Sequence, residues 1–296
     1  MMSRAPYRSP RGPAAVAALL VLAAVGCSEA SDVVDDAKDG ARKAARQRSV
    51  FSLDVGDCYN PNGGKVEGEA YLVEVVPCEE AHRGEVVGEF AVEGGPKHPG
   101  DEKIVGIADE RCAAEAQRYA PDTWALPAGV GLSHYTPTRE SWATGDRAVS
   151  CTYTVEKGTF KGSLNTAKSF EPDQLTFLKG SNSVYETLWA HQPVTDDVEA
   201  ALKDYRAQAE AVAAALGTHV EGLGGIDGTE VGKLRATLTQ AAGQWEKAAN
   251  APDADAFYLA YDQAFTLIDP GKTVAARKEL GLATTVPAED AEVWAS

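Results

Sequence analysis

The sequence predicts an α+β fold, a small antiparallel sheet stapled by disulfides and carrying one helix, followed by an all-α helical bundle domain. Three observations along its 296 residues predict this fold. Short segments rich in β-branched residues lie in the first half, cysteines lie among them, and helical periodicity fills the second half. We therefore expect an α+β domain over 51–160, a helical bundle over 170–283 and a flexible acidic tail over 284–296.

The chain begins with a stretch typical of a secretory signal. A basic leader precedes an apolar run over residues 14–25, which is too short to remain as a membrane span. The sequence Leu-Ala-Ala-Val-Gly-Cys, which ends at Cys27, resembles the lipobox of bacterial lipoproteins, in which a diacylglyceryl group is attached to the cysteine thiol. The resemblance implies a signal peptide over 1–26, a lipid anchor on Cys27 and a location outside the cytoplasm. Ordinary secretory cleavage beside a chance cysteine is the alternative.

Residues 27–50 are charged and small, a composition typical of a solvated tether. Beyond the tether, three segments are typical of strands, at 71–76, 86–92 and 149–155. The last of them alternates apolar and polar residues without interruption, so we expect one buried face, with Cys151 pointing into the core.

A helix is expected between these strands, from residue 101 to about 119. Its apolar positions recur at spacings of four and three: Ile104, Ala108, Cys112, Ala116 and Tyr119. Cys112 therefore lies on the stripe that faces the sheet.

Four cysteines remain once Cys27 is assigned to lipid: Cys58, Cys78, Cys112 and Cys151. An even count in an exported chain predicts two disulfides, for which three connectivities are possible. We favour Cys58 with Cys78 and Cys112 with Cys151, because pairing of neighbours closes the shorter loops. A structural zinc site is not expected, since the cysteines lack the short spacing of such sites.

After about residue 161 the apolar residues recur at helical spacing, and short loops separate the segments. We expect five helices that form an antiparallel bundle. The first runs from 172 to the proline at 193, and the second covers 196–216 with Gly217 as a stop. The third begins at Asp227, with Glu230 completing a capping box. The fourth runs from the proline at 252 to the proline at 270, and the fifth covers 273–280. In the first of them we expect Leu175, Leu178, Tyr185 and Leu188 on the buried face.

The net charge of −16 excludes nucleic acid as a partner, because an acidic surface repels phosphates. Beyond the leader no apolar stretch approaches the ~20 residues of a membrane span, so the lipid on Cys27 is the expected membrane attachment.

His82 and Glu85 are the residues that come nearest to a catalytic or metal-binding pattern. Their spacing offers two metal ligands or an acid–base pair, but no third ligand is recognisable. We favour a structural role, in which His82 fixes a turn beside the disulfide of Cys78. The sequence also lacks serine hydrolase and phosphate-binding motifs, so we expect no catalytic residue, no metal and no cofactor.

Trp142 and Arg147 form a second candidate binding pair. A structural interpretation places an ion pair between Asp146 and Arg147 at a turn, with Trp142 packed over it. The alternative is a surface site for a partner, since tryptophan and arginine are enriched in binding hot spots.

The order of these motifs resembles the septum formation domain of actinobacterial surface proteins. The matching features run from Gly-Asp-Cys58 and Val-Pro-Cys78 through His82, Cys112 and the Trp142-x-x-Gly-Asp-Arg147 motif to Cys151, over about residues 51–156. The resemblance implies a role in cell division, but no reaction and no agreed ligand.

The expected function is that of a non-enzymatic surface lipoprotein, a binding or scaffolding component of the cell envelope whose partner is an unknown envelope or division protein. One alternative is a ligand-binding sensor with a pocket between the two domains. Another is a metal-dependent wall hydrolase that uses His82 and Glu85.

Overall fold

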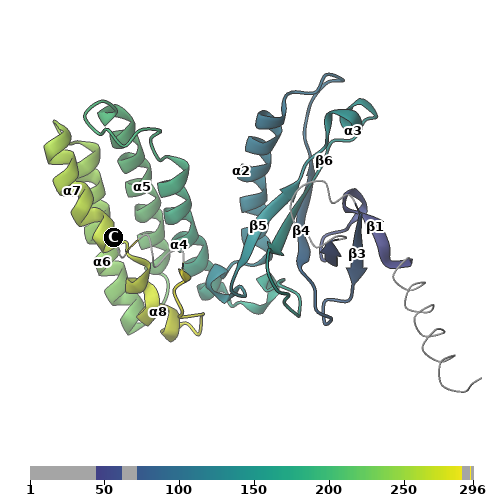
Figure 1. Cartoon of the computed structure of the whole chain (residues 1–296). Helices are drawn as coiled ribbons and strands as arrows, with labels where there is room; N and C mark the ends of the chain where they lie inside the picture. The colour runs from purple at the N-terminus through teal and green to yellow at the C-terminus, as the bar shows by residue number, and fades with distance from the viewer. Residues whose placement is uncertain (1–44, 62–71, 289–293, 295–296) are drawn as a thin grey trace, which may run out of the picture. The chain divides into compact units, whose positions relative to one another are not determined.

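The computed structural model describes residues 45–61, 72–288 and 294. The signal peptide and Cys27 lie outside these residues, so both remain predictions. From Arg46 onward the chain forms one compact unit. A sheet with one long helix occupies its first part, and a group of helices occupies its second part (Figure 1).

The sheet has six antiparallel strands in the order β1-β3-β2-β4-β6-β5. Their bounds are β1 Gln47–Ser49, β2 Cys58–Pro61, β3 Leu72–Val76, β4 Gly84–Ala91, β5 Val130–Tyr135 and β6 Ala148–Val155. The three strands expected from the sequence are confirmed as β3, β4 and β6.

The tether prediction is wrong at its C-terminal end. Gln47–Ser49 pairs with β3 as an edge strand, and Val50, which begins a 3-10 turn, is only 1% exposed. Strand pairing uses backbone groups and needs no apolar side chain, so the polar composition of this segment did not reveal it. The remainder of the expected tether, residues 27–44, lies outside the described residues.

The helix expected at 101–119 is confirmed as α2, Asp101–Tyr119, and all five apolar positions of its stripe are buried. It packs against β4, β5 and β6 on one face of the sheet. Cys112 of α2 and Cys151 of β6 form a disulfide, with their Cα atoms 5.2 Å apart. The disulfide therefore fixes the helix to the sheet.

The prediction that only one face of β6 is buried is wrong. Ser150, Thr152 and Thr154, the polar positions of the strand, are buried like the apolar ones. A second small core covers this face and consists of Val50, Leu53, Tyr59, Val73, Val86 and Tyr135. The covering residues come from segments far along the chain, which the alternation within β6 cannot show.

The expected helical region is present from residue 172 onward. Its helices are α4 Pro172–Ala190, α5 Leu202–Leu223, α6 Thr229–Ala249, α7 Ala254–Leu267 and α8 Val274–Glu279, and a short α3, Arg139–Ala143, lies between β5 and β6. Each helix from α4 to α7 packs on the next, and α8 packs on α6, around one core. No helix in the described part of the chain is long and apolar enough to cross a membrane.

The expected start and end of the second helix were wrong. It begins six residues late, after a segment in turns, and the Tyr205 hydroxyl donates to the carbonyl of Thr195 in front of that segment (2.9 Å). It also continues through Gly217, since His219 and Leu223 in its last turns are buried against the core.

Two details of neighbouring helices also differ from expectation. On α4 Leu175 is exposed, and the fully buried Phe177 takes its place. On α6 the expected capping box does not form. Instead the Glu279 carboxylate of α8 accepts hydrogen bonds from the first backbone N–H groups of α6.

Part of the expected flexible tail is packed. Trp294 stacks on Phe265 of α7, with 3.8 Å between ring centroids. Residues 289–293 and 295–296 lie outside the described part.

An ion pair links the two regions of this unit. The Arg277 guanidinium of α8 contacts the Asp122 carboxylate that follows α2, and both side chains are almost fully buried. Asp122 also accepts from the backbone N–H of Ala283 at 3.1 Å, and Arg277 lies 4.0 Å above the Trp124 ring. These contacts offset the free energy that the two charged groups lose when they are removed from water.

Candidate functional site

Glu85 lies at the centre of a cluster of hydrogen-bonded polar groups at the predicted site. It sits on β4 directly opposite Cys58 on β2 and is fully buried. The preceding Gly84 lies against the Tyr59 ring, where an added Cβ atom would come within 2.3 Å of the ring. The close approach of these strands fixes Glu85 on the face that α2 covers.

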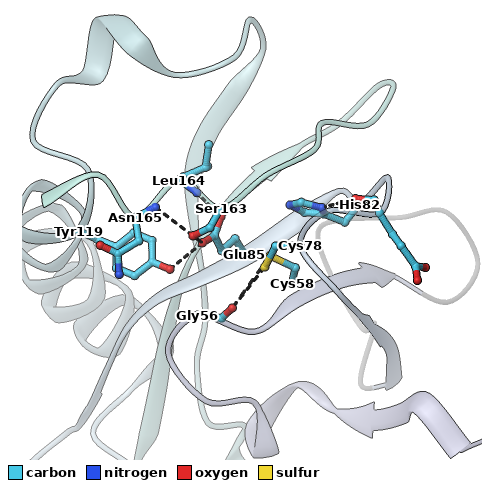
Figure 2. Close-up of a disulfide and its surroundings, with 10 residues drawn as sticks. Gly56, Cys58, Cys78, His82, Glu85, Tyr119, Ser163, Leu164 and Asn165 are labelled. Carbon is cyan, nitrogen blue, oxygen red and sulfur yellow. Dashed lines mark hydrogen bonds between the residues drawn. A yellow bond between two sulfur atoms is a disulfide. The ribbon is translucent and has the colours of Figure 1, made fainter. Parts of the chain in front are cut away.

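The Glu85 carboxylate accepts three hydrogen bonds (Figure 2). The Tyr119 hydroxyl at the end of α2 donates at 2.6 Å, and the Ser163 hydroxyl donates at 2.5 Å. The Leu164 backbone N–H donates to the second oxygen at 2.7 Å. Burial and the bond to Glu85 raise the pKa of Tyr119. The carboxylate thus ties the end of α2 and the segment after β6 to the sheet.

His82 does not join this cluster. Its Nδ1 lies 2.9 Å from the Glu80 carbonyl, and its ring meets the Phe160 ring edge-on at 4.2 Å. Its backbone exchanges two hydrogen bonds with Phe160. In Figure 2 the Glu85 carboxylate points toward Tyr119 and Ser163 rather than toward the imidazole. This geometry agrees with the structural interpretation, in which His82 fixes the turn after Cys78.

Cys58, Cys78 and Glu85 are the group of potential metal ligands found among the described residues, with ligand atoms within 4.8 Å of one another. The two cysteines form a disulfide, the pairing we favoured. Metal binding requires thiolates, which disulfide sulfur atoms do not supply. In the oxidised protein the group does not fit a metal ion.

Trp142 and Arg147 form a structural contact. Trp142 is 1% exposed, its Nε1 donates to the Gly95 carbonyl at 3.1 Å, and the Arg147 guanidinium lies 3.7 Å above its ring. Arg147 donates to the carbonyls of Trp142 and Gly95. The expected ion pair was wrong, because the Asp146 carboxylate instead accepts from the Ala148 backbone N–H at 3.0 Å. Trp142 is too buried to offer its ring to a partner.

A cavity of about 360 Å³ lies where α4 and the C-terminal residues meet the sheet region. Its wall includes Trp124, Trp189 and Trp294. The charged side chains on the wall bond to protein groups, since Gln117 contacts Glu186 and Arg277 contacts Asp122. The cavity therefore presents mainly an apolar surface.

The partners of these residues were missed by the sequence analysis. Tyr119 was expected only as an apolar stripe residue, and Ser163 was not singled out. Asp122 and Arg277 are 155 positions apart. No local pattern connects residues at such separations, so the sequence alone carried no signal for these bonds.

The fold and these contacts define a disulfide-bonded α+β module whose best-placed polar residues hold its segments together. Residues 55–197 match the family model described as septum formation, the family that the resemblance named. The match continues past residue 156 and includes α4. No curated protein and no solved structure matches the chain.

Proposed function

We propose that this protein is an extracytoplasmic lipoprotein, anchored through Cys27, that acts as a non-enzymatic binding or scaffolding component of the envelope in cell division. The septum formation domain over residues 55–197 carries the proposal, since its description points to division and the envelope. The two disulfides support a location outside the cytoplasm, because disulfides persist in oxidising compartments.

The bonding of the candidate catalytic residues supports a non-enzymatic role. A general acid or base must reach the reacting group of a substrate. All three hydrogen bonds to Glu85 come from the protein itself, and the carboxylate is fully buried. His82, the other residue of the hydrolase alternative, is equally buried and bonds to a local carbonyl.

The anchor is tested by Cys27→Ser in the full chain. The variant is expected to lose incorporation of a fatty-acid analogue and to leave the membrane fraction, because the thiol is the acceptor of the lipid. Ser28→Ala is the matched control and keeps both properties. Labelling that persists in Cys27→Ser contradicts the lipoprotein assignment.

The division role is tested by a fluorescent fusion at the C-terminus of the full chain in its native host. We expect enrichment at division sites over the lateral envelope, with the same pattern for Ser28→Ala. Uniform fluorescence, together with normal septa after deletion of the gene, contradicts a role in division.

A further inference from the structure

A small cavity inside the helical region has a wall rich in aromatic side chains. It measures about 210 Å³ and lies between α4, α5, α7 and the segment that joins α4 to α5. Five aromatic side chains contribute to its wall: Trp189, Tyr205, Phe257, Tyr258 and Tyr261. Phe257 and Tyr261 stack at 5.5 Å, and Tyr205 meets Phe257 edge-on at 5.5 Å.

Gln208 lies on the wall of this cavity and carries an unpaired acceptor. Gln208 is only 3% exposed, and its Nε2 donates to the Leu188 carbonyl at 2.8 Å. That bond fixes the orientation of the amide, so Oε1 is the free atom. Oε1 has no hydrogen-bond partner within the part of the chain described. A buried acceptor without a donor is unfavourable, so a ligand that brings an N–H or O–H group and displaces the side chains that now cover Oε1 gains this hydrogen bond.

The charge around the cavity favours a cation. Asp196 lies on the wall, whereas the described wall residues include no lysine or arginine. The hydrogen bond from Tyr205 to the carbonyl of Thr195 holds the neighbouring Asp196 at this place. Burial chiefly raises the pKa of Tyr205, and the neighbouring Asp196, Tyr258 and Asp197 raise it further. Aromatic rings attract cations through their electron-rich faces.

We propose that this cavity binds a protonated primary amine carried on a short aliphatic chain. The ammonium group donates to Gln208 Oε1, Asp196 balances its charge, and the aromatic side chains surround its methylene groups. A quaternary ammonium ion has no N–H group and leaves Oε1 unpaired. A volume of about 210 Å³ admits a chain the size of a lysine side chain and excludes larger ligands such as oligosaccharides.

Isothermal titration calorimetry of the full-length protein tests the site with n-butylammonium chloride. We expect saturable binding, at least about tenfold weaker binding of tetramethylammonium, and no binding of 1-butanol, since only the first probe brings both charge and N–H groups. Saturable binding of 1-butanol with the affinity of n-butylammonium, or no binding of n-butylammonium, overturns the proposal.

Variants assign the binding to the named residues. Gln208→Met keeps the volume but removes the acceptor, and should weaken n-butylammonium binding about tenfold. Asp196→Asn changes an exposed residue, so we expect the variant to fold, and it should weaken n-butylammonium binding about fivefold. Glu199→Gln makes the same charge change outside the wall and should have no effect. Equal affinities of Asp196→Asn and Glu199→Gln overturn the proposal even where Gln208→Met fails to fold.

The source of the amine is distinguished by a second probe, Nα-acetyl-L-lysine N-methylamide. Tighter binding than that of n-butylammonium indicates a lysine side chain of a polypeptide as the natural ligand. Equal or weaker binding indicates a free amine. Both results support the site, and neither depends on lipidation or on a role in division.

Discussion

Residues 46–164 and residues 172–282 keep their cores together by different means. The first region has two small cores on opposite faces of the sheet, and two disulfides and the Glu85 carboxylate connect its segments. The second has one continuous core and contains no cysteine. A small sheet buries little apolar surface on either face, so covalent and polar links add what packing does not supply. Amphipathic helices bury enough surface to need few such links.

The largest expected effect comes from removing the disulfide that fixes α2 to the sheet. Cys112→Ala with Cys151→Ala should destabilise the first region by about 4 kcal/mol, because the bridge closes a long loop of the unfolded chain. Hydrogen exchange read peptide by peptide should show lost protection in α2 and β6, with α6 unchanged. Equal loss of protection in α6 would show that the two regions unfold as one, and would contradict the claim that they are held together by different means.

The second effect concerns the Glu85 carboxylate. Glu85→Gln removes the negative charge to which three groups donate, and its N–H₂ group requires the Tyr119 and Ser163 hydroxyls to accept instead of donate, so we expect a loss of about 3 kcal/mol in the free energy of unfolding. Urea denaturation of the variant measures it. Glu89→Gln, an exposed change on the same strand, is the matched control and should cost little. A loss of stability no larger than that of the control would contradict the role of Glu85 in tying α2 and the segment after β6 to the sheet.

The third effect makes the helical region sensitive to pH. His219 is 3% exposed, lies against the Phe177 ring and Gly180, and burial lowers its pKa to about 4. The unfolded chain, with a pKa of about 6.5, therefore binds more protons between these values. Stability is complete above about pH 6.5 and falls as the pH drops toward 4. We expect a loss of about 2 kcal/mol between pH 7 and pH 5.

His219→Leu isolates this contribution, because other groups also titrate in the same range. The pH dependence of its urea midpoint in the helical region should be flatter than that of the parent. A parent and variant with identical pH profiles would show that His219 does not carry the effect.

The elements whose side chains follow a local period were predictable. The α2 stripe and the α6 stripe, Val231, Leu234, Leu238, Ala241 and Trp245, are buried as their spacing indicates. Both disulfides agree with the favoured pairing, and Cys112 and Cys151 lie on the facing apolar positions that their elements predict. In each case the burial of a residue depends mainly on its own element.

Contacts between distant segments were not predictable. Gln47–Ser49 joins the sheet by backbone pairing with β3, and the carboxylate of Glu85 meets donors that lie 34 and 78 positions away. Gln208 was not singled out, because an unpaired acceptor is visible only when every neighbouring donor has been placed. These failures share one cause, since sequence periodicity reports the face of an element but not what covers it.

The smallest effect tests the polar link that the helical region does possess. Glu279 accepts from the backbone N–H groups of Thr229, Glu230 and Val231 at 2.9 to 3.0 Å, and these bonds lower the pKa of its carboxyl group. A negative charge at a helix N-terminus is favourable, so Glu279→Gln should lower the stability of the helical region measurably but less than the three changes above. The first turn of α6 should exchange its amide hydrogens faster, while the centre of the helix keeps its protection. Glu230→Gln, which also removes a charge from this turn, is the control and should leave those amides protected. If Glu279→Gln instead lost as much stability as Glu85→Gln, the helical region would depend on polar links as strongly as the sheet region does.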